Sequence, residues 1–330
     1  MGTPGMNAAP YPIAGPYLHA NAFTPHIMWE TSAALAPTLI AAWFIFGLNA
    51  IITTLWCIGF CVLFEALFDL ALKRRPRIGD GSAFLAGLLF AFNLPPAAPW
   101  LVCAVGSLVA VVVIKGIFGG LGKNSFNPAL AARAFCMAVF PFALSQYPAP
   151  VHSFINMDAV ASATPLAVIK SGGIDALVSE FGDTGSIVMH FIAGDRGGCI
   201  GETSIAALCI GGIFLLWRGI ISWHVPVAMI VTAGIFALIA GHSASYALVH
   251  LLSGGLVLGA FFMATDYVTS PVYPLGKIIF GAGCGLILMT IRLYGTYPEG
   301  CMFSILIMNM FTPLIDRLTV WRRYGAGKRS

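Results

Sequence analysis

The stretch Ala50–Leu72, with the sequence AIITTLWCIGFCVLFEALFDLAL, decides the fold class. A helix needs about 20 mostly apolar residues to cross a bilayer, and this stretch meets that requirement. It ends at the basic cluster Lys73–Arg77, and such clusters gather on the cytoplasmic side of membranes. The sequence therefore predicts an all-α integral membrane protein in which this end of the segment faces the cytoplasm.

Composition places the whole chain in the membrane class. Of its 330 residues, 58% are hydrophobic and 9% are charged, and the mean hydropathy is +0.89. Soluble domains carry about 25% charged residues, so this composition excludes a water-soluble globular fold. The net charge of +4 comes from clusters typical of membrane topology rather than from a basic face on a soluble domain. We therefore expect the lipid bilayer as a partner and no binding of nucleic acid.

Cysteine and histidine patterns predict no metal centre and no catalytic residue on this chain alone. The eight cysteines include no Cys-x-x-Cys pair, the spacing typical of iron–sulfur ligands. Cys57 and Cys61 share a helix face, where two small thiols pack as hydrophobes or make half of a metal site. The histidines show no metal-ligand spacing.

Hydropathy divides the chain into about ten spans. We expect a cytoplasmic arm over 1–30, a five-helix group over 31–147, an outer-face loop over 148–202, a second five-helix group over 203–320 and a basic cytoplasmic tail over 321–330. With Lys73–Arg77 in the cytoplasm, this count puts both termini there as well. Because five is odd, the two groups have opposite orientations, which predicts an inverted repeat.

Two polar breaks support the repeat. Gly81–Gly87 leads to Asn93-Leu94-Pro95 in the first group, within a span that is short for a full crossing. His250–Gly255 leads to Asp266 in the second, after a span expected over Tyr246–Ala264. Such breaks mark cofactor or ion sites in membrane proteins, although glycine and proline are also common in ordinary membrane helices. Asp266 is therefore a candidate for contact with a cofactor or an ion.

Two further acids lie near the end of the decisive span. Glu65 and Asp69 are an i,i+4 pair one turn before Lys73. We expect an interfacial salt bridge with Lys73, and ion handling is the alternative.

The middle segment contains a small, polar run, Asp158–Leu166, between the two hydrophobic halves. The Thr164 hydroxyl on an outer-face loop could carry a covalent group, and the plain alternative for Thr164-Pro165 is an ordinary helix start. Further along, glycines around Arg196 would let backbone N–H groups and a guanidinium approach a phosphate. The alternative there is a turn before a helix that Thr203 caps.

Nucleotide-binding motifs do not appear. Gly119–Asn124 resembles a phosphate loop, but it lacks the required glycine spacing and has Asn124 in place of Ser or Thr. No dinucleotide-binding fingerprint is present, so we expect no direct binding of NAD.

Short motifs spread over nearly the whole chain resemble one family. It contains the D subunit of the bacterial Rnf complex and, more distantly, the B subunit of the sodium-pumping NADH:quinone oxidoreductase. The matching motifs are Thr24-Pro25-His26, Phe126-Asn127-Pro128-Ala129, Ser162-Ala163-Thr164-Pro165-Leu166, Gly201-Glu202-Thr203-Ser204, Phe262-Met263-Ala264-Thr265-Asp266, Glu299-Gly300 and Met308-Asn309. Their order and spacing carry the resemblance, and the compact length is more similar to the Rnf protein.

The resemblance implies a flavin acceptor. The family's pattern is Asp-x-x-Ser-Gly-Ala-Thr, and Asp158, Ala163 and Thr164 keep their places in it, whereas Ala161 and Ser162 replace Ser and Gly. It implies FMN joined through its phosphate to Thr164, and a second, non-covalent flavin (riboflavin or FMN) among the helices. Arg196 and Lys170 are then candidates for balancing the phosphate charge.

The resemblance also implies a urea-transporter-like fold of two inverted five-helix repeats in the bacterial inner membrane. The expected function is electron transfer through flavin within an ion-translocating ferredoxin:NAD oxidoreductase, coupled to Na⁺ or H⁺ movement. Expected partners are the other Rnf subunits, including the FMN-bearing G subunit and the membrane A and E subunits. From the residues alone, a solute channel or transporter without redox chemistry stays open, because inverted repeats and broken helices fit it equally well.

Overall fold

A computed structural model describes residues 24–74, 77–118, 120, 122–155 and 161–319. Asp158 and the expected basic tail, 321–330, lie outside the described residues, as does most of the expected arm over 1–30. The described part of that arm is already helical, since the first helix begins at Thr24.

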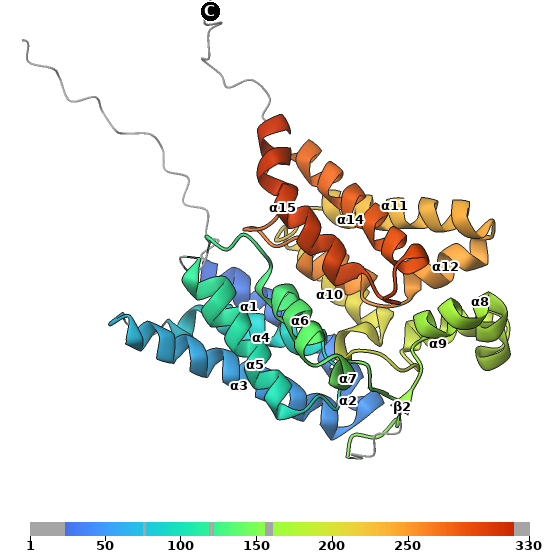
Figure 1. Ribbon diagram of the computed structural model, residues 1–330, viewed down its shortest axis with the longest axis horizontal. Coiled ribbons are helices and arrows are strands. Elements are labelled where there is room, and N and C mark those ends of the chain that lie inside the picture. The colour runs from blue at the N-terminus through green and yellow to red at the C-terminus, as the bar shows by residue number, and fades with distance from the viewer. Residues whose placement is uncertain (1–23, 75–76, 119, 121, 156–160, 320–330) are drawn as a thin grey trace, which may run out of the picture.

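The helices form two groups, one from each half of the chain, and the two groups lie side by side (Figure 1). The first group contains α1 (Thr24–Ala34), α2 (Ala36–Phe46), α3 (Leu48–Ala71), the short η1 (Ile78–Asp80), α4 (Ser82–Phe92), α5 (Trp100–Leu108), its π-helical continuation η2 (Val109–Ile117), α6 (Pro128–Val139) and α7 (Pro141–Leu144). The second group contains α10 (Ile205–Trp217), α11 (His224–Gly241), α12 (Ala244–Leu252), α13 (Leu256–Leu258), the π-helical η4 (Gly259–Met263), α14 (Pro274–Tyr294) and α15 (Cys301–Thr319).

The middle segment is more ordered than the loop expected over 148–202. It contains α8 (Pro165–Phe181), α9 (Thr184–Ala193) and the short η3 (Ile200–Glu202). Before them, β1 (Tyr147–Pro148) pairs antiparallel with β2 (Ala161–Ser162). This small ladder departs from a purely helical fold, and it ties the end of the first group to the residues that precede α8.

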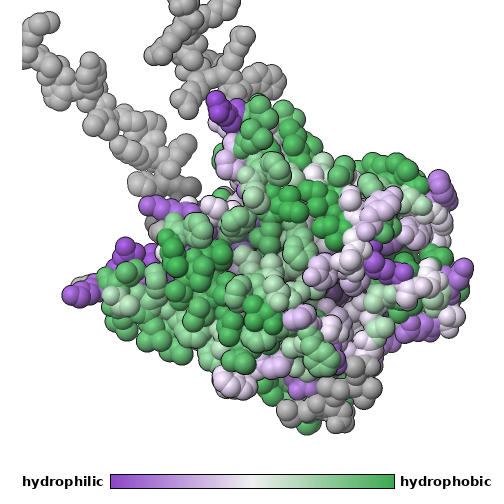
Figure 2. All heavy atoms as spheres, in the orientation of Figure 1, coloured by the Kyte–Doolittle hydropathy of each residue, from purple (hydrophilic) through white to green (hydrophobic). Residues whose placement is uncertain are grey.

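The prediction of a helical membrane protein is confirmed. Among the residues that the structure describes, six helices are long and apolar enough to cross a membrane, and a bent pair over Ala244–Leu252 and Leu256–Met263 makes up to seven. Large apolar side chains are exposed along these helices, such as Leu55 on α3 and Ile239 on α11. Figure 2 shows hydrophobic residues over much of the helical surface, with polar residues gathered at helix ends and near α8 and α9. Such a surface suits a lipid environment.

The span expected over Tyr246–Ala264 is a bent pair of helices rather than one straight helix. The chain bends by 64° between α12 and α13, because Ser253 is extended and Gly254 has a φ of 64°. A Cβ at Gly254 would lie 1.7 Å from Oε2 of Glu299. Glycine is therefore needed here both for the left-handed backbone and for space.

Gly254→Ala is expected to lower the free energy of unfolding by about 1–3 kcal/mol, because alanine is strained at this φ and overlaps Glu299. SDS-induced unfolding of the purified chain measures this loss. Gly173→Ala is the matched control, since Gly173 has a φ of 71° with open space around its Cβ position. Equal losses in the two variants would contradict a steric contribution from Glu299.

The prediction of a salt bridge from Glu65 or Asp69 to Lys73 is wrong, because both acids pair with other basic residues. Glu65 lies 2.5 Å from Nζ of Lys115 on η2, and Asp69 lies 3.2 Å from Arg77. The π-helical stretch brings Lys115 into the interior, where its Nζ also donates to Ser82. Sequence spacing favours neighbours on one helix, whereas these partners come from other elements.

Candidate functional site

Thr164 lies immediately before α8 and caps that helix. Its backbone is extended, Pro165 is the first helical residue, and its Oγ1 accepts a hydrogen bond from the N–H of Ala167 at 3.3 Å. The plain helix-start interpretation is thus correct for the backbone. The side chain remains partly exposed, so capping does not prevent the hydroxyl from being reached.

Thr164 borders a narrow cleft where the middle segment meets both helical groups. The cleft has a volume of about 20 Å³, which is room for about one water molecule. It is lined by Arg133, Tyr147, Thr164, Pro165, Leu166, Arg196, Gly197, Glu202, Gly254, Pro298 and Glu299. A flavin ring system does not fit within this space, but charged groups of the wall can act on an anion at its mouth.

Charged side chains gather in the cleft wall and just behind it. Arg133 lies 3.6 Å from Glu202, and Arg292, just behind the wall, lies 3.2 Å from Glu299. With Arg196, three guanidinium groups therefore face two carboxylates, and all three arginines are buried. Burial and the nearby Glu299 also raise the pKa of Glu202, which favours its neutral form. An anion would balance this cluster.

Arg196 is held firmly in that wall. Its Nη1 donates to the carbonyl of Leu252 and its Nη2 to the carbonyl of Glu202, both at 2.7 Å. The guanidinium carbon lies 4.4 Å from the ring centre of Phe191. Burial lowers the pKa of Arg196 to about 10, so the group stays charged at neutral pH. The structure thus brings Arg196 and Thr164 to one cleft, as their placement in the middle segment suggested.

The residues before Thr164 differ in their surroundings. Oγ of Ser162 is buried without a hydrogen-bond partner among the described residues, and a Cβ on Gly197 would lie 2.2 Å from it. Ala163 is exposed. Asp158 lies outside the described residues.

Lys170 lies outside the cleft lining. Its exposed Nζ donates to the carbonyls of Gly295 and Tyr297, the latter at 2.9 Å. It would have to exchange these bonds to reach a phosphate on Thr164.

Sequence reasoning missed Arg133, which lines the cleft, and Arg292, which lies just behind it. Arg133 is the single basic residue of α6, and Arg292 is one of two basic residues of α14, the other being Lys277. An ionisable residue inside a membrane helix is the signal that could have found them. Sequence reasoning identified Glu202 only as part of the motif Gly201-Glu202-Thr203-Ser204.

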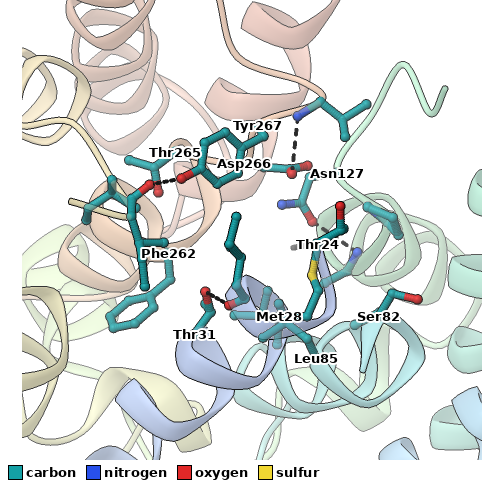
Figure 3. Close-up of a pocket in the computed structure, with 18 of the residues that line it drawn as sticks. Thr24, Met28, Thr31, Ser82, Leu85, Asn127, Phe262, Thr265, Asp266 and Tyr267 are labelled. Atoms are coloured by element: carbon teal, nitrogen blue, oxygen red, sulfur yellow. Dashed lines mark hydrogen bonds between the residues drawn. The ribbon is translucent and has the colours of Figure 1, made fainter. Parts of the chain in front are cut away.

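A second, larger cavity lies between the two helical groups. It has a volume of about 370 Å³ and a mostly apolar lining. Figure 3 shows Thr24, Met28 and Thr31 from α1 and Ser82 and Leu85 from α4 on one side, with Phe262, Thr265, Asp266 and Tyr267 on the other. Polar groups enter from Lys115, Asn127 and Asp266. The size and lining are typical of a pocket for a planar organic cofactor.

Asp266 lines this cavity at the break after η4, as its sequence position predicted. Its carboxylate accepts hydrogen bonds from the N–H of Val268 at 3.4 Å and the hydroxyl of Thr269 at 3.2 Å. Desolvation by the surrounding protein raises the pKa of Asp266. The residue therefore offers a hydrogen-bonding carboxyl group to a molecule in the cavity.

Comparison with known proteins places this chain among membrane components of redox complexes. The model of the NQR2, RnfD, RnfE family matches residues 13–325. The chain is 46% identical to the D subunit of the Na⁺-translocating ferredoxin:NAD⁺ oxidoreductase complex of Acetobacterium woodii, covering 96% of this chain and 95% of the relative.

Two further relatives are similar over comparable lengths. The D subunit of the proton-translocating ferredoxin:NAD⁺ oxidoreductase complex of Clostridium ljungdahlii is 40% identical, over 94% of this chain and 95% of its own length. The D subunit of the ion-translocating oxidoreductase complex of Halorhodospira halophila is 35% identical, over 95% of each chain.

Proposed function

The chain belongs to the NQR2, RnfD, RnfE family, and from this premise we propose that it carries electrons through flavin within an ion-translocating ferredoxin:NAD⁺ oxidoreductase complex. It is the D-type subunit of such a complex and is not catalytic alone. The observation that carries the proposal is near full-length similarity to two D subunits of ferredoxin:NAD⁺ oxidoreductases. Their names give Na⁺ in one case and protons in the other, and electron transfer in this complex is coupled to movement of one of these ions.

We propose that FMN is attached to Oγ1 of Thr164 through its phosphate. Three observations support this: the hydroxyl is partly exposed, it borders the cleft, and two buried arginines, Arg133 and Arg196, line that cleft. A phosphodiester carries one negative charge, which Arg196 and Arg133 would balance. Bound there, the flavin accepts one or two electrons, and these residues position it and tune its potential.

The small volume of the cleft determines where the ring system of the flavin can lie. Because about 20 Å³ holds no ring system, the ring lies outside the cleft, at the surface beside α8. That position suits electron exchange with another protein of the complex. Asp158, Ser162 and Ala163 belong to the segment that the flavin-attaching enzyme would recognise, and Lys170 contributes positive charge from outside the cleft lining.

We assign a second, non-covalent flavin, riboflavin or FMN, to the cavity between the helical groups. The volume of about 370 Å³ and the apolar lining support this assignment. Asp266 is placed to hydrogen-bond to the polar part of such a ligand. NAD binds elsewhere in the complex, since this chain lacks a dinucleotide fingerprint.

Ala86→Phe is expected to remove most of the flavin that acid releases from the purified chain, because a phenyl ring would fill part of the cavity that Ala86 lines. Chromatography of the released flavin measures the loss. Thr164→Val is the crossed control, since it should leave this acid-released pool unchanged. An Ala86→Phe protein with a full acid-released pool would place the second flavin elsewhere.

We further propose that ten spans form two inverted five-helix repeats. Three shorter apolar helices, α4, α6 and α10, added to the seven candidate spans, make up this number. Neighbour relations support the repeat: α3 packs on α4 and α5, as α11 packs on α12 and α14. Urea transporters have a similar arrangement.

The proposed topology puts both termini in the cytoplasm and Thr164 on the outer face of the bacterial inner membrane. The other Rnf subunits, including the FMN-bearing G subunit and the membrane A and E subunits, are the proposed partners.

A solute transporter without redox chemistry is the competing function. Flavin fluorescence of the chain on a denaturing gel under ultraviolet light separates the two. A dark band from cells that contain the flavin-attaching enzyme would favour the transporter.

A further inference from the structure

A third cavity lies beside the turn between α10 and α11. Its volume is about 270 Å³ and, unlike the flavin-sized cavity, its lining is more polar than apolar. Ser222, Thr265, Ser270 and Lys277 supply hydroxyl and ammonium groups, and Tyr267 separates it from the larger cavity. A polar pocket of this size has room for a small charged group.

Lys277 is the charged group of this lining. Its Nζ lies 3.2 Å from Oγ of Ser222, and no carboxylate of the described residues lies within 4 Å of it. Two carboxylates occur nearby, but both have other partners. Asp316 accepts from the N–H of Val272 at 3.0 Å, and Asp266 accepts from Val268 and Thr269. The ammonium is therefore available to an anion that enters the cavity.

Surrounding residues place the cavity at a membrane–water boundary. Trp217 and Trp223 flank the turn and are strongly exposed, as expected for tryptophans in the headgroup region. Leu275, Ile278 and Ile279 on α14 present exposed apolar side chains next to Lys277. One wall of the opening is thus apolar and lipid-facing, whereas the interior is polar.

The cavity lies at the same end of the bundle as the carboxyl end of α15. A Cβ on Gly276, one residue before Lys277, would lie 3.0 Å from Oγ1 of Thr319. The sequence after Thr319 contains Arg322, Arg323, Lys328 and Arg329, so the positive-inside rule assigns this end to the cytoplasm. The cytoplasmic leaflet is the one in which anionic headgroups attract basic groups near the surface.

We propose that this cavity binds the phosphodiester headgroup of an anionic phospholipid. Lys277 pairs with the phosphate, the hydroxyls of Ser222 and Ser270 donate to its oxygens, and the acyl chains run along the apolar face of α14. Basic pockets between membrane helices bind lipid headgroups in this manner. The site shares no lining residue with the cleft at Thr164, and it shares a wall with the proposed flavin cavity at Thr265 and Tyr267.

The test uses the intact complex, stripped of lipid in detergent and titrated with phosphatidylglycerol while native mass spectrometry counts bound lipid. Lys277→Gln is expected to weaken this binding by about fivefold or more, the factor for one lysine near an anionic surface. Ser222→Ala is expected to weaken it less. Arg317→Gln is the matched control, because it removes an exposed positive charge at the same end of the bundle but lies outside the cavity.

Four results would overturn the proposal. They are unchanged phosphatidylglycerol binding in Lys277→Gln, an equal loss in Arg317→Gln, equal affinity of the unsubstituted complex for phosphatidylcholine, or full displacement of the lipid by inorganic phosphate. The last result would assign the cavity to a free anion. Flavin content is measured on the same samples, so that a failure of the lipid proposal can be distinguished from a failure of the flavin assignment.

Discussion

Thr164→Val is expected to abolish the covalent flavin of this chain and, with it, electron transfer through the complex. Valine keeps the shape and branching of threonine but has no oxygen to form the phosphoester. The band on a denaturing gel should lose its flavin fluorescence completely, while the amount of chain in the membrane changes little. Loss of the capping bond to Ala167 costs only about 1 kcal/mol, so the fold is expected to survive.

Two variants test whether the effect belongs to this hydroxyl. Thr164→Ser keeps an oxygen at the same place and should keep fluorescence. Ser162→Ala removes a buried hydroxyl two residues earlier, which has no partner among the described residues, and should also keep it. A fluorescent Thr164→Val band would move the attachment to another residue, with Ser162 the first to examine.

Arg196→Gln is expected to have the second-largest effect, on both stability and flavin potential. The change breaks the hydrogen bonds to the backbone carbonyls of Leu252 and Glu202, and leaving a buried acceptor unsatisfied costs about 1–3 kcal/mol. Reduced flavin is the more negative form, so removing the cation should make the midpoint potential more negative. At an effective dielectric of about 20 and roughly 10 Å, the shift is on the order of 30 mV.

Redox titration of the purified complex measures this shift, and two controls separate charge from packing. Arg196→Lys keeps the charge while losing the two-pronged hydrogen bonding, so its potential should stay near that of the unsubstituted protein although its stability falls. Lys170→Gln removes an exposed charge outside the cleft and should shift the potential less. A larger shift for Lys170→Gln than for Arg196→Gln would reverse their assigned roles.

Sequence reasoning predicted the parts of the fold that depend on local composition. Apolar length identified α3, α11 and α14, and a break was expected at Asn93, at the end of the short third span. The break at Gly254 was missed because glycine is common in membrane helices. What requires glycine there is the carboxylate of Glu299, which comes from a distant part of the chain.

The candidate site was predictable only in part, for the same physical reason. Thr164 and Arg196 lie in one polar segment, and their shared cleft follows from that. Arg133 and Arg292 come from α6 and α14, and a sequence does not show which helix ends meet. Lys170 was predicted as a site residue because it lies close to Thr164 along the chain. In the structure its ammonium is instead bound to the carbonyls of Gly295 and Tyr297.

The most direct test of the covalent flavin is peptide mass spectrometry of the chain purified from its own membrane. Trypsin should release the peptide over residues 134–170, which contains Thr164 and ends at Lys170. We predict that this peptide carries the added mass of one FMN less one water, with fragment ions that place the addition on Thr164. An unmodified peptide from cells that contain the flavin-attaching enzyme, or an addition on a different residue, would contradict the account.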